Sequence, residues 1–434
     1  MSNDRFHEQL VDFALNLKWE DAPQTTRDVL KLSLQDWIAV ALAGVDEPVG
    51  LALRNMLLNE GGIGAAYVFG AGVKMPARSA ALANGTTSHA LDYDDTHFLH
   101  IGHPSVVIFS AALAVAEHVD ASGRAFLEAA LLGFESSCRI GHWLGRAHYD
   151  AGFHMTATAG CFGAALAAAR LLGADQGQMN NALGLASTRS SGLKAQFGSM
   201  GKPYNAGLAA ANGVEAALLA VGGMSTDGRG ITSFAEGHAG MMDETALTGL
   251  GKEFVTESIS HKFHACCHGT HAALEALAKL DVEAREVIEV LISVNPRWLS
   301  VCNQQTPSSG LEAKFSYRMC AAMAMAGLDT GVLSTFIDPH YENAKLCALR
   351  DLVQVQGDAD LTDGMARVLV TRHGGMTRQA TYDLDQPMDI ETRRQRVHAK
   401  AGALIGDAKA QNILRQVELL DQADHLVGLV GALA

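Results

Sequence analysis

The chain has 434 residues, of which 48% are hydrophobic and 18% charged, and 33 Lys and Arg against 47 Asp and Glu give a net charge of −14. This composition excludes an intrinsically disordered chain, and the length predicts more than one compact unit. So acidic a protein is a poor partner for nucleic acid. A locally basic pocket could still bind a small anionic substrate.

Seven scattered cysteines and the absence of any CxxC indicate reduced thiols rather than a disulfide scaffold or a zinc ribbon. The N-terminal segment is polar and amphipathic, unlike a signal peptide. The most apolar windows either fall short of the ~18–20 clean residues of a membrane span or carry charge. We therefore expect a soluble, cytoplasmic protein with no membrane partner.

Apolar residues recur near a period of 3.6 from residue 28 to about residue 223, which predicts consecutive helices. The clearest segments are 29–42, 105–118, 125–132, 155–172 and 206–221. Gly173 and Gly222 follow apolar runs and are helix-stop signals. Because the runs are rich in Ala and Gly, which let helices approach closely, we expect a tightly packed bundle.

The pattern changes near residue 285. Residues 287–294, 352–356 and 367–371 read as strands, and residues 373–376 read as a hairpin tip before a further strand over 378–383. Residues 311–326 and 332–336 look helical, and helix returns over 392–401 and 408–420. The predicted fold is mainly α: a large all-helical domain of residues 1–258 and 391–434, with a smaller α+β lid domain of residues 259–390 inserted into it.

The common nucleotide-binding motifs are missing. Residues 198–203 resemble a Walker A loop only superficially, because the opening glycine is absent and Pro203 replaces Ser or Thr. No GxGxxG follows a strand, and no GxSxG is present. We therefore expect neither ATP nor NAD, and no cofactor.

Four polar islands interrupt the apolar sequence. The first, residues 91–105, holds three carboxylates and three histidines within twelve residues: Asp92, Asp94, Asp95, His97, His100 and His103. It comes directly before a predicted helix, with Ser105 as the expected N-cap, and a helix start favours a bound anion. The alternative is a solvated acidic loop.

The second and third islands also lie at predicted helix starts. His154 opens the helix over 155–172, where capping or core packing is the alternative role. In residues 197–207, glycines bring Lys202 to the start of an Ala-rich helix, and an ammonium group there suits a carboxylate ligand. The alternative for this segment is a surface loop.

The fourth island, residues 260–271, contains four histidines and two cysteines. The pairs His264/His268 and Cys267/His271 are spaced i, i+4, which would place each pair on one helix face and raises a zinc hypothesis. HExxH is absent, and no Asp or Glu lies nearby in the sequence. We therefore favour histidine donors around an anion and expect no metal.

Together the islands supply His, Lys and Asp. This set suits removal of a proton from the carbon next to a carboxylate, because fixed cations stabilise the enediolate charge that develops. A second group must take the proton, and a third must protonate the leaving group.

These residues resemble the MmgE/PrpD family, which includes 2-methylcitrate dehydratase, cis-aconitate decarboxylase and an iminodisuccinate epimerase. The resemblance covers essentially the whole chain. It rests on five segments in the right order: 91–96 with 103–105, 153–160, 201–203 with 206–207, Lys262 with Cys267 and His271, and 310–317.

The resemblance implies a homodimer with a metal-independent site between its two domains for a small di- or tricarboxylate. The positions that match the family's site are Asp92, Thr96, His103, His154, Lys202 and Lys262. We assign the two lysines as carboxylate clamps, and Asp92, His103 and His154 as the acid/base set. Cys267 and His271 are expected to bind substrate, and Ser316 and Tyr317 to close the pocket. Which histidine is the base stays open.

Two departures from the family pattern bear on the substrate. His264 and Ala265 stand where the family often has an aromatic residue and then Pro, and Cys267 stands where the decarboxylases have His. We therefore rank dehydration of a 2-methylcitrate-like substrate first, epimerisation of an iminodisuccinate-like dicarboxylate second, and decarboxylation third. A metallohydrolase and a non-catalytic helical scaffold are alternatives from other classes.

Overall fold

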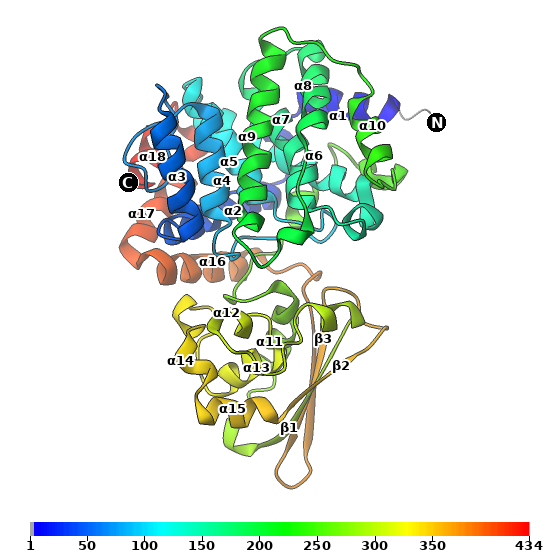
Figure 1. Cartoon of the computed structure of the whole chain (residues 1–434), viewed down its shortest axis with the longest axis vertical. Helices are drawn as coiled ribbons and strands as arrows, with labels where there is room; N and C mark the ends of the chain where they lie inside the picture. Colours follow the sequence, from blue (N-terminus) through cyan, green and yellow to red (C-terminus); the bar gives the residue numbers. More distant parts are fainter. Residues whose placement is uncertain (1–3, 434) are drawn as a thin grey trace. The chain divides into compact units, whose positions relative to one another are not determined.

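The computed structural model describes residues 4–433 and is mainly α-helical, as predicted (Figure 1). The chain divides into two compact units. The first contains the described residues up to 261 and those from 397 onward, and the second contains residues 262–396. Residues 1–3 and 434 of the predicted helical domain lie outside the described range. No helix among the described residues is both long and apolar enough to cross a membrane.

The first unit is built from helices. They are α1 (Asp4–Asn16), α2 (Gln24–Ala43), α3 (Pro48–Glu60), α4 (Ala77–Ser88), α5 (Pro104–His118), α6 (Gly123–Asp150), α7 (Met155–Leu171), α8 (Gln176–Arg189), α9 (Gly201–Val221), α10 (Gly230–Gly237), α17 (Asp407–Glu418) and α18 (Val427–Leu433). α16 (Ile390–Ile405) begins in the second unit and ends in the first. α7 is central, because it packs against α5, α6, α8 and α9.

Small residues let these helices approach closely, as expected from the composition. α4 and α9 cross where a Cβ on Gly85 would lie 2.8 Å from the Cα of Gly207. α6 and α7 cross where a Cβ on Gly163 would lie 2.6 Å from the carbonyl oxygen of Gly133. Real Cβ atoms do not tolerate such distances, so each glycine allows a backbone-to-backbone contact that fixes the neighbouring helix ends.

The second unit combines short helices with a sheet. Its helices are α11 (His271–Ala278), α12 (Gly310–Ala313), α13 (Tyr317–Met325), α14 (Asp338–Tyr341) and α15 (Ala344–Asp351). The strands are β1 (Val287–Val294), β2 (Val353–Gly357), β3 (Met365–Arg372) and β4 (Thr377–Asp383), in the order β2-β1-β3-β4. β1 and β2 are parallel, with Val290 opposite Val353, and the other two pairings are antiparallel. α11 packs on β3 and β4, and α13 on β2.

Three local predictions are wrong. The helix expected over 311–326 is interrupted at 314–316, where Ser316 caps α13 by accepting a hydrogen bond from the Met319 N–H. Of the helix expected over 332–336, only a 3₁₀ turn over Leu333–Thr335 forms. Residues 264–267 are not helical, so the pairs His264/His268 and Cys267/His271 do not share a helix face.

Candidate active site

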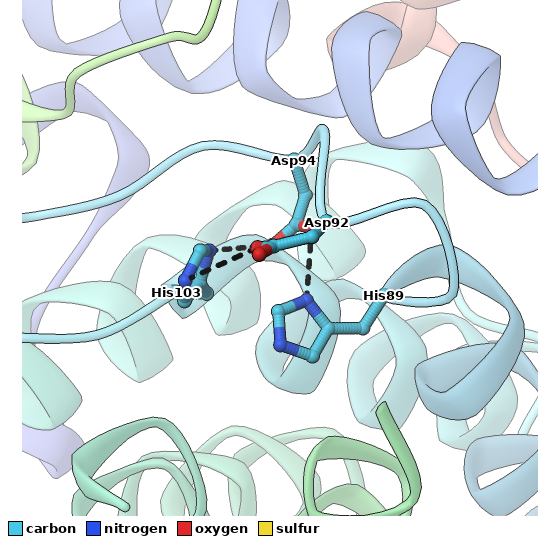
Figure 2. A group of neighbouring side chains, drawn as sticks. All are labelled: His89, Asp92, Asp94 and His103. Carbon is cyan, nitrogen blue, oxygen red and sulfur yellow. Dashed lines mark hydrogen bonds and ion pairs between the residues drawn. The ribbon is translucent and has the colours of Figure 1, made fainter. Parts of the chain in front are cut away.

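Three segments far apart in sequence, at residues 89–103, 154 and 202, meet in the helical unit. His89 is the C-cap of α4, His103 the N-cap of α5, and His154 the N-cap of α7. Lys202 is the second residue of α9. Asp92 and Asp94 belong to the loop between α4 and α5 (Figure 2). Three helices thus begin at the cluster, and the positive ends of their dipoles favour a bound anion.

Asp92 is the carboxylate that links the lysine to a histidine. Its Oδ2 lies 2.6 Å from the ammonium nitrogen of Lys202, and its Oδ1 lies 3.7 Å from Nε2 of His103. The side chains of Asp92, Lys202 and His103 are 32%, 15% and 11% exposed. These three groups thus form the accessible edge of the cluster.

Asp92 also has an unusual backbone. Its φ is +51°, in the left-handed region that residues other than glycine seldom adopt, and Ile101 in the same loop has a φ of +52°. Such strain of ~1–3 kcal/mol persists where the surrounding structure holds it, and it collects at functional sites. The strained turn directs the Asp92 carboxylate towards Lys202 and His103.

A second carboxylate lies behind the first. Asp94 is buried between two imidazole rings, with Oδ1 2.9 Å from Nδ1 of His89 and Oδ2 2.9 Å from Nδ1 of His103 (Figure 2). Burial alone would raise the pKa of Asp94, but the two neighbouring histidines outweigh it and hold that pKa well below its ordinary value. Asp94 is thus ionised at neutral pH.

His154 has different surroundings. Its backbone N–H donates to the carbonyl of Gly192, and its Nδ1 lies 3.3 Å from the side-chain amide nitrogen of Asn205. The same amide nitrogen also donates to the carbonyl of Leu193. Asn205 is therefore the donor, and Nδ1 of His154 the acceptor, in the contact between them. Burial lowers the pKa of His154 well below its usual value, and the nearby His89, Lys202 and His103 lower it further. His154 is therefore neutral, with its hydrogen on Nε2.

The α5 N-terminus is capped differently from the prediction. His103 is the N-cap, Pro104 is the first helical residue, and the carboxylate of Asp95 accepts hydrogen bonds from both the N–H and the hydroxyl of Ser105. The prediction of Ser105 as the N-cap is wrong, because α5 begins at Pro104 and its N-cap, His103, lies two residues earlier. The Ser105 hydroxyl donates to Asp95 instead. Burial raises the pKa of Asp95 to about 8, with Asp36 and Asp94 adding to this effect.

The first polar island divides into two groups. His97 donates its Nε2–H to the carbonyl of Val255 at 2.9 Å, and burial lowers the pKa of His97 to about 4. His100 is packed beside Gly141, and burial lowers its pKa to about 3. Both rings therefore support the loop rather than join the cluster. Thr96 forms a two-way backbone pair with Ser260, at 2.9 and 2.8 Å.

Three residues that sequence reasoning left out support the cluster. His89 and Asn205 contact it as described above. Lys400 of α16 is buried, with its ammonium nitrogen 2.7 Å from the carbonyl oxygen of Tyr93 and 2.7 Å from Asp36 of α2. Lys400 thereby ties the C-terminal segment to the loop that carries Asp92 and Asp94.

The other predicted site residues belong to the second unit. Lys262 is buried there, and burial together with His268, His264 and Lys262 lowers the pKa of His271 well below its usual value. Tyr317 donates its hydroxyl to the carbonyl of Gly269, and the Ser316 hydroxyl donates to the carbonyl of Gln304. The backbone N–H of Cys267 donates to the carbonyl of Lys314. The hydroxyls of Ser316 and Tyr317 thus have structural partners within the unit.

The expectation that no acid lies near the histidines of the fourth island is wrong. Glu275 of α11 lies 3.3 Å from Nε2 of His264 and 2.5 Å from Arg396. Burial would raise the pKa of Glu275, but hydrogen bonds from His264 and Arg396 lower it to about 2. Glu275 follows His271 by one turn of α11. Residues 264–267 are not helical, so the spacing in the sequence did not show that Glu275 would lie beside His264.

One group of side chains has the spacing of a metal site. Potential ligand atoms of His89, Asp92, Asp94 and His103 lie within 4.8 Å of one another. The Nδ1 atoms of both histidines face the carboxylate of Asp94, which needs them as hydrogen donors, and Lys202 already supplies a cation to Asp92. This donor set suits protons and an organic anion better than a divalent ion.

Comparison with known proteins identifies the family of the chain. The family models for the MmgE/PrpD N-terminal and C-terminal domains match residues 8–253 and 264–422. The chain belongs to the MmgE/PrpD family.

Its relatives include a protein of Aspergillus terreus named cis-aconitate decarboxylase, 30% identical over 94% of this chain and 91% of the relative. A second A. terreus protein of that name (strain NIH 2624 / FGSC A1156) is 31% identical, over 64% of this chain and 61% of its own length. The human protein of the same name is 32% identical over 35% of this chain and 32% of its own length. Decarboxylases are lyases, so the known relatives are lyases of this family.

Proposed function

We propose that the protein is a lyase for a small di- or tricarboxylate, and that His103 exchanges a proton with the carbon next to a substrate carboxylate. The observation that carries the proposal is the group of Lys202, Asp92 and His103 at the start of three helices. Lys202 binds a carboxylate of the substrate. Its charge then stabilises the enediolate that forms when the adjacent carbon gains an electron pair.

The surroundings of the two histidines separate their roles. His103 has a carboxylate at Nδ1, which raises the basicity of Nε2, so it serves as the acid/base. His154 is neutral and carries its hydrogen on Nε2, so it serves as a hydrogen-bond donor to the substrate.

Lys262 is proposed as the second carboxylate clamp. Thr96, four residues after Asp92, pairs with Ser260, and Lys262 follows Ser260 by two residues. A doubly clamped substrate needs at least two carboxylates. Lys262→Ala is expected to raise KM for a tricarboxylate by roughly tenfold or more, the loss of one charge-assisted contact. An unchanged KM would remove Lys262 from the proposal.

Decarboxylation of a cis-aconitate-like substrate is the reaction that the relatives favour. Loss of CO₂ breaks a carbon–carbon bond and leaves its electron pair on the substrate, and protonated His103 then delivers a proton to carbon. Dehydration of a 2-methylcitrate-like substrate is the second candidate, favoured by Cys267 in place of the decarboxylase histidine. There His103 removes the proton from carbon, and the hydroxyl group on the neighbouring carbon is protonated and leaves as water. Epimerisation of an iminodisuccinate-like dicarboxylate, ranked second from the sequence, is the third candidate.

A panel in D₂O distinguishes these reactions. The probes are cis-aconitate, 2-methylcitrate, citrate, malate, tartrate and iminodisuccinate, followed by CO₂ release, alkene absorbance and mass spectrometry. Decarboxylation releases CO₂ and places one deuterium in the product. Dehydration forms an alkene without releasing CO₂ and without adding deuterium to the product. Deuterium entering the substrate with loss of optical rotation indicates epimerisation. No turnover of any probe by the wild-type protein would overturn the proposal.

The remaining expectations concern organisation. We propose that the helical part, formed from both chain ends, is the catalytic domain and that the α+β part acts as its lid. A homodimer in the cytoplasm, without nucleic-acid or membrane partners, is proposed as the working form. Sedimentation of the purified protein tests the dimer.

A further inference from the structure

Asp94 cannot act on a substrate directly. Its side chain and that of His89 are fully buried, and both oxygens of the carboxylate are engaged by imidazole nitrogens (Figure 2). His89 sits deeper than His103, and its Nε2 is buried without a hydrogen-bond partner among the residues that the structure describes. The pair therefore lies behind the accessible edge formed by Asp92, His103 and Lys202.

The contacts of Asp94 determine where each histidine carries its hydrogen. An ionised carboxylate only accepts hydrogen bonds, so Nδ1 of His89 donates to Oδ1 of Asp94 at 2.9 Å. Nδ1 of His103 lies 2.9 Å from Oδ2 in an ion-pair contact whose angle is outside hydrogen-bond geometry. This nitrogen must still carry a hydrogen, because a lone pair so close to the carboxylate would be repelled. A neutral His103 then has its lone pair on Nε2, the nitrogen on the side of Asp92. In the opposite tautomer Nε2 would carry a hydrogen and could not take a proton from carbon.

We propose that Asp94 is a positioning residue that holds His103 in the Nδ1–H tautomer, with His89 fixing the carboxylate from its other side. When Nε2 takes a proton, the electron pair of the broken C–H bond stays on the substrate and the imidazolium faces Asp94 at Nδ1. When Nε2 gives the proton to carbon, the same tautomer is restored. The inference rests on the proposed role of His103 and deepens it.

His89 gives the arrangement its rigidity. With one imidazole, the carboxylate of Asp94 could rotate about its Cβ–Cγ bond, whereas two imidazoles on opposite oxygens fix both the rotation and the plane. The other charged or titratable groups that interact with this trio are Asp92, Asp95 and His100 from the loop, His154 from α7 and Lys202 from α9. Only Asp94 contacts the Nδ1 side of His103 among them.

Asp94→Asn tests the inference because it keeps the shape and removes the charge. The amide nitrogen can face His103 Nδ1 and force the wrong tautomer. An equivalent change in an Asp–His pair of serine proteases lowers kcat by ~10⁴, and we expect a fall of ~10³–10⁴ here with KM changed less than about threefold. The limb of the kcat/KM profile that His103 sets should move to lower pH, because the negative charge of Asp94 no longer stabilises the imidazolium.

Asp95→Asn is the matched control, because Asp95 is the next buried carboxylate of the loop and its hydrogen bonds go to Ser105 rather than to an imidazole. Its kcat should stay within about threefold of the wild type. Asp94→Glu, which keeps the acceptor, should restore part of the activity lost in Asp94→Asn. His89→Gln, which keeps a donor, should lower kcat much less than Asp94→Asn.

The tautomer can be observed without activity by ¹⁵N NMR of histidine-labelled protein, with His103→Asn used to assign the signals. The wild type should show protonated Nδ1 on His103 near neutral pH. Observation of the Nε2–H tautomer overturns the inference even if Asp94→Asn does not fold. If His103→Asn is inactive while Asp94→Asn keeps wild-type kcat and tautomer, this inference alone fails. If His103→Asn is fully active, the proposed function fails with it.

Discussion

Lys202 and Asp92 form an ion pair of 2.6 Å at the start of α9, although 110 positions separate them in the chain. The pair places an ammonium group beside the accessible nitrogen of His103. In the absence of substrate Asp92 is the counter-ion of Lys202, and a substrate carboxylate would compete for the same cation.

Lys202→Ala should lower kcat/KM by roughly 10- to 150-fold, because it removes one charge-assisted contact of ~1.5–3 kcal/mol. KM should rise and kcat fall together, since the lysine contacts both the bound carboxylate and the developing charge. Lys74→Ala is the control: Lys74 also pairs with a carboxylate, that of Glu117 at 2.9 Å, but its side chain is half exposed. Unaltered kinetics in Lys202→Ala would place Lys202 outside the site.

Asp95 should make the fold less stable as the pH rises. Burial raises its pKa to about 8 from 3.8, so between these values the folded protein holds a proton that the unfolded chain has released. The resulting loss of unfolding free energy is at most about 1.4 kcal/mol per pH unit. Asp95→Asn, which carries no such proton, should lose less stability than the wild type from pH 4 to 8 in urea titrations. Parallel stability curves for the two proteins would refute this assignment.

Gly207→Ala should loosen the helix crossing that supports the cluster. The added Cβ would collide with the carbonyl oxygen of Leu82 and the hydroxyl of Thr86 on α4, so one helix must shift. We expect a loss of ~1–3 kcal/mol of unfolding free energy, the usual result of overpacking. Gly237→Ala in α10 is the control, since its Cβ meets nothing within 4 Å and alanine favours helix. Equal stabilities of the two variants would contradict the close contact.

Removal of divalent ions should leave turnover unchanged. Potential metal-ligand atoms of His89, Asp92, Asp94 and His103 lie close together. The two histidine rings already face the negative charge of Asp94, and Lys202 already pairs with Asp92. Dialysis against a chelator, with metal content measured before and after, is the test. Stoichiometric zinc whose loss abolishes activity and whose return restores it would show that the cluster is a metal site.

Periodicity and turn residues predicted the local elements well. β1 occupies residues 287–294 as expected, the hairpin tip lies between β3 and β4, and α7 and α9 begin next to His154 and Lys202. These features depend on neighbours in the sequence, where side-chain period and glycine position act directly.

Periodicity and turn residues do not predict contacts between segments that are distant in the sequence. His89 lies only five residues before Asp94, but the sequence does not show that its ring faces that carboxylate, and Lys400 lies more than 300 positions from Tyr93. His97 and His100 share the first island with His103, yet their rings are buried elsewhere. Tertiary packing decides which member of a dense polar segment faces the site, and an accurate helix assignment alone does not determine it.

Proton transfer by His103 is tested most directly by following deuterium from D₂O into carbon, with His103→Asn compared with the wild type on the panel substrate that turns over. Asparagine keeps a donor for Asp94 and removes Nε2. The account predicts that the variant still binds the substrate in calorimetry, with Kd within about threefold, but transfers deuterium at least about 10³-fold more slowly. Transfer at the wild-type rate would contradict it.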